Sequence, residues 1–245
     1  MVNGIGKEFI EGTKYQYLDD SDQKKGLPQP PLELEYDRTK TVIDLPKPSE
    51  IQVSSTSLRE AIENRRSVRK YSQEPLSLEE LSYLLWCTQG VKKIIPRPAT
   101  LRTVPSAGAR HAFETYLLVN NVKGLQLGVY RFLAIEHKLI EIDTESDIAA
   151  KITEACLGQK FVETSAVTFI WTAVAYRMQW RHGERGYRFM HLDAGHVCQN
   201  LYLSAESIDC GVCAIGVFSD DDLNRLLNVD GEDQFVIYMA TVGKR

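Results

Sequence analysis

A cluster of cationic side chains lies near residue 65. Arg65, Arg66 and Arg69 fall within five residues, with Ser67 between them and Lys70 directly after. Guanidinium groups are planar, bidentate donors and a serine hydroxyl is a short neutral one, so the set matches what a phosphate dianion requires. Because the cluster sits where a predicted helix ends, its arginines would also stabilise the negative end of the helix dipole. The spacing supports the phosphate site and the structural role equally.

A second stretch has almost no side-chain bulk. Pro105 is followed by Ser106, Ala107 and Gly108, whose small side chains let a flat ligand approach the backbone closely. The alternative is an ordinary turn before the strand predicted at Glu114, and the stretch on its own favours that turn.

A CxxC pair, Cys210 and Cys213, raises the question of zinc or a redox dithiol. No second pair stands at metal-site spacing, and His191 and His196 would lie about 140° apart on a helix. A thioredoxin-type dithiol opens a helix, whereas this pair falls in a predicted strand. We therefore expect no metal, and two cysteines that serve as small core residues.

The elements that would position these residues follow from periodicity and capping. Ser57 with Glu60, and Ser77 with Glu80, have capping-box form and open two helices, the second burying Leu81, Leu84 and Leu85. A long helix at 186–207 is apolar on nearly every side, as in a core or a subunit interface. Further predicted elements are helices at 146–157 and 220–227, strands at 114–120, 128–134, 138–142, 166–175, 211–217 and 235–242, and a loop over 91–110. Strands and helices mix without strict alternation, which predicts an α+β domain with a largely antiparallel sheet.

The totals exclude several classes of protein. A chain of 245 residues can bury a large core. Its formal net charge of −4 disfavours non-specific binding to nucleic acid. Its five cysteines are an odd, scattered set, which indicates reduced thiols rather than a disulfide framework. The apolar run at 166–175 is too short to span a membrane, and the start lacks the pattern of a signal peptide. We expect a soluble cytoplasmic protein.

Residues 1–54 differ in amino-acid composition from residues 55–245, which we expect to form the functional domain. The segment is polar and proline-rich, so it cannot form one long helix. It is either a disordered leader or an extended arm lying over the domain or a partner. Apolar residues favour the arm, namely Val42, Ile43, Leu45, Ile51 and Val53.

The order and spacing of four motifs carry a family resemblance that covers the chain from about residue 55 to its end. The motifs are RRSVRKY at 65–71, RTVPSAGARH at 102–111, HLDAGHVCQNLYLSAESIDCGVCAIGVF at 191–218 and VIYMATVGKR at 236–245. Together they resemble the FMN-dependent nitroreductase family, and within it the SagB-type dehydrogenases. The resemblance implies an α+β fold whose homodimer shares two flavins at its interface, with the long helix at that interface.

The resemblance also implies roles for individual residues. One group holds the FMN phosphate and ribityl chain, one residue lies near the flavin ring, and a loop touches the flavin bound mainly by the other subunit. A strand faces the central ring, where a main-chain N–H can donate to N5. The residues that hold the phosphate and ribityl chain are Arg65, Arg66 and Ser67, with Lys244 and Arg245 as further phosphate ligands, and the residue near the ring is Arg69. The loop consists of Pro105, Ser106, Ala107 and Gly108, and the strand that faces the central ring contributes Cys213, Ala214, Ile215 and Gly216.

The implied chemistry is hydride transfer through flavin N5, which needs no dedicated protein nucleophile. The leading hypothesis takes hydride from NAD(P)H to a nitroaromatic, quinone or similar small acceptor. One alternative is a SagB-type dehydrogenase that oxidises azolines in a peptide with partner proteins, although 180–189 holds no counterpart of the Lys-Tyr pair of such enzymes. Another is a flavin-binding carrier or sensor without turnover. No catalytic acid or base is assigned, and packing explains the motif neighbours more readily; these are Tyr71, His111, Tyr187 and Arg188.

Overall fold

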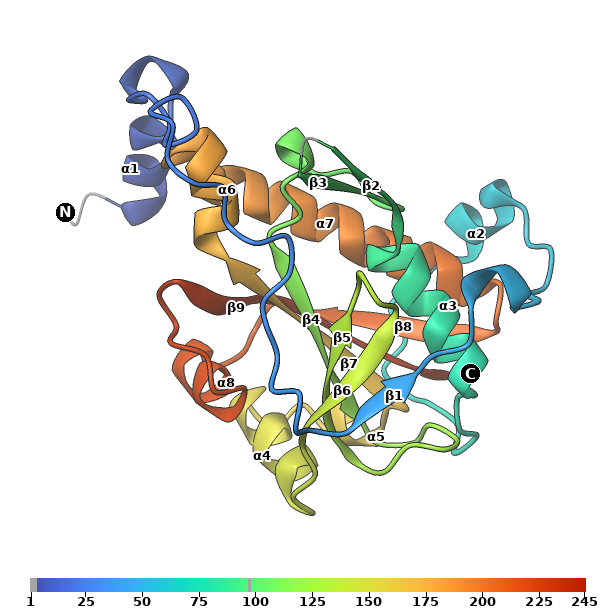
Figure 1. Ribbon diagram of the computed structural model, residues 1–245. Helices are drawn as coiled ribbons and strands as arrows, with labels where there is room; N and C mark the ends of the chain where they lie inside the picture. Colours follow the sequence, from blue (N-terminus) through green and yellow to red (C-terminus); the bar gives the residue numbers. More distant parts are fainter. Residues whose placement is uncertain (1–3, 97) are drawn as a thin grey trace.

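A seven-stranded sheet forms the centre of the computed structural model, which describes residues 4–96 and 98–245 (Figure 1). Every neighbouring pair of strands is antiparallel, as predicted. Across the sheet the strands are β1 (Val42–Asp44), β6 (Lys138–Asp143), β5 (Gly128–Leu133), β4 (Phe113–Val119), β7 (Val167–Val174), β9 (Gln234–Lys244) and β8 (Cys210–Ile215). Strand β8 is therefore an edge strand, next to the strand that closes the chain.

Helices cover both faces of the sheet. One layer contains α2 (Leu58–Asn64), α3 (Leu78–Gln89) and α7 (Arg185–Glu206); the other contains α4 (Ile148–Ala155), α5 (Phe161–Thr164) and α8 (Asp220–Leu226) (Figure 1). Two hydrophobic cores result, one under α3 and α7 and one under α4 and α8. The long helix α7 crosses the sheet and contacts α2, α3 and β8. It is buried on several sides, as its apolar sequence predicted.

Local sequence explains where the helices begin. Both predicted capping boxes are formed: the Ser57 hydroxyl accepts from Glu60 N–H at 3.2 Å, and the Ser77 hydroxyl from Glu80 N–H at 3.2 Å. Each serine satisfies a backbone donor that the first turn of a helix leaves unpaired. The leucines predicted for the buried side of α3 are fully buried, namely Leu81, Leu84 and Leu85.

One prediction about element type was wrong, and one helix was not predicted. The stretch 91–110, predicted as a loop, contains a hairpin of β2 (Val91–Ile95) and β3 (Ala99–Arg102). Strand β2 is mostly exposed, so it lacks the apolar alternation that marks a strand. A helix, α6 (Ala175–His182), follows β7 directly, and the continuous apolar run at 166–175 hides that junction.

The arm, residues 4–54, contains α1 (Ile5–Gly12), two short 3₁₀ turns at Tyr15–Tyr17 and Pro48–Glu50, and strand β1, which pairs with β6. Its central part lies against buried charges of the sheet. Arg177 and Glu114 form a buried ion pair at 2.5 Å, Arg177 Nε donates to the Pro31 carbonyl at 2.9 Å, and the Leu34 N–H donates to Glu114 at 2.9 Å. The arm backbone thus satisfies charges that would otherwise be buried with too few partners.

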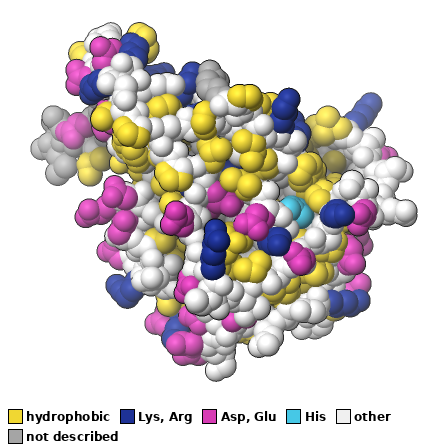
Figure 2. Space-filling view, in the orientation of Figure 1, with side chains coloured by type: hydrophobic (Ala, Val, Ile, Leu, Met, Phe, Trp, Pro, Cys, Tyr) yellow, Lys and Arg dark blue, Asp and Glu magenta, His cyan; other side chains and the backbone are white. Residues whose placement is uncertain are grey.

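The surface of the described residues shows no single-sign field on the face seen in Figure 2, where basic and acidic side chains are interspersed. Within residues 4–96 and 98–245, none of the helices has both the length and the apolar composition needed to cross a bilayer.

Candidate functional site

The RRSVRKY segment lies across the end of the sheet, against its edge strand. The Val68 N–H donates to the Val212 carbonyl of β8 at 2.9 Å, and the Ser72 N–H donates to the Lys244 carbonyl of β9 at 2.9 Å. An edge strand has backbone groups that no neighbouring strand satisfies, and the segment takes some of them. The cationic motif is thereby fixed to β8, the strand on which the flavin-facing residues were predicted.

Two glycines make this close packing possible. Gly211 and Gly243 are paired across β8 and β9. A Cβ at Gly211 would lie 2.6 Å from the Val68 side chain, and one at Gly243 would lie 2.7 Å from the Tyr71 ring. Neither contact is tolerable, so only glycine lets the segment lie directly on the two strands.

The arginines of the motif have no acidic partners within residues 4–96 and 98–245. In the described part of the chain, no carboxylate lies within the 4.0 Å ion-pair distance of Arg65, Arg66 or Arg69. Two of them instead face aromatic rings: the Arg65 guanidinium lies 5.2 Å from the Tyr202 ring centre, and that of Arg69 lies 6.0 Å from the Phe161 ring centre. A dianionic phosphate would balance this uncompensated charge, so the residues fit the phosphate end of a flavin mononucleotide.

Tyr202 of α7 connects this motif to the strand predicted to face the flavin ring. Its hydroxyl lies 3.0 Å from Ser67 Oγ and accepts the Ala214 N–H at 2.9 Å. Cys213 and Ile215 beside Ala214 are buried, whereas Gly216 is exposed, and a Cβ there would meet nothing closer than 3.9 Å. The structure therefore brings the motif and the 213–216 strand end together.

The small-residue loop lies elsewhere on α7. The Ala107 N–H is 3.3 Å from both carboxylate oxygens of Asp193, and Ser106 Oγ accepts the His111 N–H at 2.9 Å. Burial raises the pKa of Asp193, while hydrogen bonds from Ser106 and the Ala107 N–H oppose that rise. Gly108 has a positive φ of 61°, a conformation that glycine adopts without strain. Asp193 thus holds the loop that starts at the exposed Pro105.

Helix geometry separates the two groups of residues within one chain. Asp193 and Tyr202 are nine positions apart, which places them on opposite sides of α7 and roughly 13 Å apart along its axis. Each is buried against the segment it holds. One chain therefore does not bring Pro105, Ser106, Ala107 and Gly108 to the same side of the helix as the arginine motif.

The last two residues are paired with carboxylates. Lys244 Nζ contacts Glu80 and donates to the Ile208 carbonyl at 2.8 Å, and the Arg245 guanidinium contacts Glu206. These pairs join the end of β9 to α3 and α7. In this arrangement the charges of Lys244 and Arg245 are already balanced, unlike those of the RRSVRKY arginines.

The motif neighbours considered as acids or bases are held by packing. His111 is buried, and burial with the nearby Arg102 and Arg110 lowers its pKa to about 3. Burial raises the pKa of Tyr71, whose hydroxyl donates to the Val68 carbonyl at 2.7 Å. Tyr187 stacks on a phenylalanine ring at 6.4 Å, and Arg188 donates to Thr13 of the arm.

The CxxC cysteines do not face one another. Cys210 and Cys213 are three positions apart on β8, so the alternation of a strand points their side chains to opposite faces. Both thiols are free and buried, and burial raises the pKa of each. This geometry agrees with the expected role as core residues.

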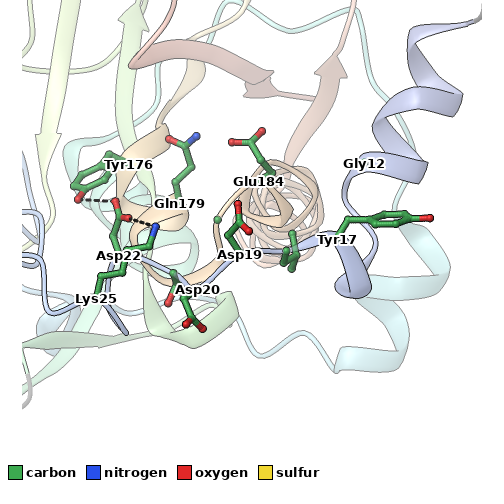
Figure 3. Close-up of a pocket in the computed structure, with 12 residues that line it drawn as sticks. Gly12, Tyr17, Asp19, Asp20, Asp22, Lys25, Tyr176, Gln179 and Glu184 are labelled. Atoms are coloured by element: carbon green, nitrogen blue, oxygen red, sulfur yellow. Dashed lines mark hydrogen bonds and ion pairs between the residues drawn. The ribbon is translucent and has the colours of Figure 1, made fainter.

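The hollow beside the arm is acidic. It has a volume of about 310 Å³ and lies between the arm and the α6–α7 junction. Figure 3 shows the carboxylates of Asp19, Asp20, Asp22 and Glu184 around it, and only Lys25 offers a cationic group among the labelled residues. Excess negative charge disfavours a phosphate, so this hollow does not compete with the arginine motif.

Sequence reasoning did not single out Tyr202, Asp193, Gly211 or Gly243. Asp193 offered a signal, because a carboxylate at a position of α7 that is buried among apolar neighbours needs a polar partner. The two glycines and Tyr202 offered none, since their roles depend on which strands pair and which segment lies over them.

Comparisons with known proteins agree with this architecture. The family model described as "Nitroreductase family" matches residues 62–244. A nitroreductase-family protein of Methanocaldococcus jannaschii is 32% identical over 203 residues, which are 83% of this chain and 96% of that protein. The crystal structure of a nitroreductase-family protein from Anabaena variabilis shares 29% identity with a TM-score of 0.70, covering 84% of this chain and 42% of that one.

A second similarity covers a shorter part of the chain. The trifolitoxin-processing protein TfxB of Rhizobium leguminosarum bv. trifolii is 35% identical over 109 residues, which are 43% of this chain and 29% of that protein. Taken together, the comparisons and the fold define a flavin-dependent oxidoreductase. Within that class, the chain belongs to the nitroreductase family.

Proposed function

We propose that the protein binds FMN and transfers hydride through flavin N5, from NAD(P)H to a nitroaromatic, quinone or similar small acceptor. The observation that carries this proposal is the group of three arginines, fixed against the edge strand β8, that have no acidic partner among the described residues. Family membership supports an enzyme rather than a carrier without turnover.

The residues have distinct proposed tasks. Arg65, Arg66 and Ser67 hold the phosphate, and Arg69 lies nearer the ring, where a cation stabilises negative charge on the reduced flavin. Bound FMN supplies the hydride chemistry, so the protein's task is to bind and orient it. The Cys213, Ala214, Ile215 and Gly216 segment faces the ring with its main chain. We leave Lys244 and Arg245 out of the phosphate set, because each would first have to break an ion pair.

We further propose that two copies of the chain build each flavin site. The opposite placement of Asp193 and Tyr202 on α7 supports this, because the loop at Pro105, Ser106, Ala107 and Gly108 points away from the motif of its own chain. A two-fold dimer would present the loop of one subunit to the motif of the other.

A peptide-tailoring dehydrogenase is the second candidate. The similarity to TfxB over 109 residues favours it. The two functions differ in the electron donor, because a tailoring enzyme takes its electrons from the peptide. Anaerobic bleaching of the flavin absorbance by NADH or NADPH, followed by turnover with a quinone, supports the reductase. A flavin that stays oxidised with both nucleotides contradicts it.

Replacing Arg65 and Arg66 together with Ala tests the phosphate site. Each charge-assisted hydrogen bond contributes about 1.5–3 kcal/mol, so we expect the FMN dissociation constant to rise at least about 100-fold. Fluorescence quenching during FMN titration of the flavin-free protein measures it. Arg225→Ala is the matched control, because this arginine lies on α8 in the opposite helical layer. Equal affinity in the double variant and the control would remove the assignment.

A further inference from the structure

The Tyr202 hydroxyl joins two parts of the proposed site that are far apart in sequence. It accepts the Ala214 N–H at 2.9 Å and lies 3.0 Å from Ser67 Oγ, while its ring lies under the Arg65 guanidinium at 5.2 Å. The residue is 8% exposed, so its hydroxyl has little access to water. Thr241 of β9 also joins the two segments: its hydroxyl lies 2.7 Å from that of Tyr71 and donates to the Cys213 carbonyl at 3.3 Å, whereas Tyr202 reaches Ser67.

The direction of these hydrogen bonds follows from the donors. A backbone N–H only donates, so the Tyr202 oxygen is the acceptor toward Ala214. The phenol then has its own proton to give, and Ser67 Oγ is the partner within reach. When the phenol donates to Ser67, the serine proton is directed away from Tyr202, and since Ser67 is exposed this proton is available to a bound ligand. Such a chain of donors strengthens each bond in it.

We propose that Tyr202 is a positioning residue for the FMN phosphate: it relays the Ala214 N–H to Ser67, so that the serine hydroxyl donates outward to phosphate. Its ring face also fixes the Arg65 guanidinium beside that hydroxyl. This inference rests on the proposed FMN site and adds to it a residue on α7, outside the RRSVRKY motif.

The relay predicts an effect confined to the phosphate end. Tyr202→Phe keeps the ring and removes the hydroxyl, so the preference for FMN over riboflavin, which lacks phosphate, is expected to fall about 5- to 10-fold. Riboflavin affinity itself is expected to change less than about twofold. Tyr130→Phe is the matched control, because this buried tyrosine donates to the Gln126 carbonyl at 3.0 Å, away from the site.

A double-mutant cycle separates the relay from a merely structural role. Since Tyr202 acts through Ser67, the loss in FMN preference for Ser67→Ala with Tyr202→Phe is expected to equal that of Ser67→Ala alone, not the product of the two single losses. The ³¹P resonance of bound FMN is expected to shift in Tyr202→Phe and not in Tyr130→Phe. The inference would be overturned if the losses in FMN preference multiplied in the double variant, or if Tyr202→Phe lost equal affinity for riboflavin and FMN.

The outcomes also separate this inference from the proposed function. If the Arg65/Arg66 variant loses FMN but Tyr202→Phe keeps its full preference for FMN, only the relay fails. If the wild-type protein does not bind FMN, both fail. Should Tyr202→Phe not fold, Ser67→Ala is the second variant, since this side chain is exposed; an unchanged preference there overturns the relay as well.

Discussion

His111 shows how burial decides the chemistry of a single residue. It lies in the RTVPSAGARH motif, next to the loop proposed to touch the flavin, and by type it is a candidate proton donor. Burial, with the positive charges of Arg102 and Arg110, lowers its pKa to about 3. A histidine in this state stays neutral at physiological pH, so it contributes packing and hydrogen bonding rather than a proton.

The low pKa of His111 makes folding stability depend on pH. The unfolded chain binds a proton at this histidine below about pH 6.5, whereas the folded chain does so only near pH 3. The stability due to neutral His111 is therefore fully present above pH 6.5 and is lost as pH falls toward 3. Between pH 7 and pH 5, we expect wild type to lose about 2 kcal/mol more free energy of unfolding than His111→Gln.

Urea unfolding of FMN-saturated protein at the two pH values measures this difference. His191→Gln is the control, because it makes the same replacement at an exposed position of α7. If His111→Gln loses as much stability as wild type, the histidine is protonated in the folded state and the argument from burial fails.

At the scale of elements, the sequence predicts what depends on neighbours along the chain. The capping serines Ser57 and Ser77 begin helices where expected, because their partners are three residues away. Strand β2 was missed because its exposed residues carry no apolar pattern. The motif residues were proposed from the order of the motifs and the family resemblance, but Tyr202 and Gly211 were not singled out, since the roles of both depend on β8 lying under the motif.

Replacing Gly211 tests whether the RRSVRKY segment packs directly on strands β8 and β9. In Gly211→Ala, the new methyl group would lie 2.6 Å from the Cβ of Val68, a β-branched residue with little freedom to move. We expect a loss of about 1–3 kcal/mol in the free energy of unfolding, as for other overpacked sites. FMN binding is expected to weaken as well, because Val68 lies between Ser67 and Arg69.

Thermal or urea unfolding and an FMN titration measure both effects. Gly6→Ala in α1 is the matched control, since a Cβ there meets no atom within 4 Å. Wild-type stability and affinity in Gly211→Ala would mean that the segment does not rest on β8 as described.

At the scale of the molecule, α7 determines how the site is divided. Its buried Asp193 holds the small-residue loop and its buried Tyr202 holds the arginine motif, on opposite sides of one rigid helix. No movement of a loop within one chain easily brings both to one flavin. A second copy would supply the missing half, which is why we propose a dimeric site rather than a monomeric one.

Mixed dimers test this division. One chain carries Arg65→Ala with Arg66→Ala, and the other carries Pro105→Glu, which places a negative charge on an exposed loop residue. Gly108→Trp is the poorer block, because a Cβ there would lie 2.5 Å from Arg181 and would distort the loop itself. Neither variant alone is expected to retain flavin.

In a heterodimer of the two variants, a shared site predicts how many of the two flavin sites are intact. One of the two sites combines both defects, while the other combines an intact motif from one chain with an intact loop from its partner. We therefore expect about one FMN per heterodimer, measured by absorbance after purification through two different affinity tags. If each chain built its site alone, both sites would be defective and the heterodimer would hold no flavin. That result would refute the shared site and would require the loop and the motif of one chain to meet around α7.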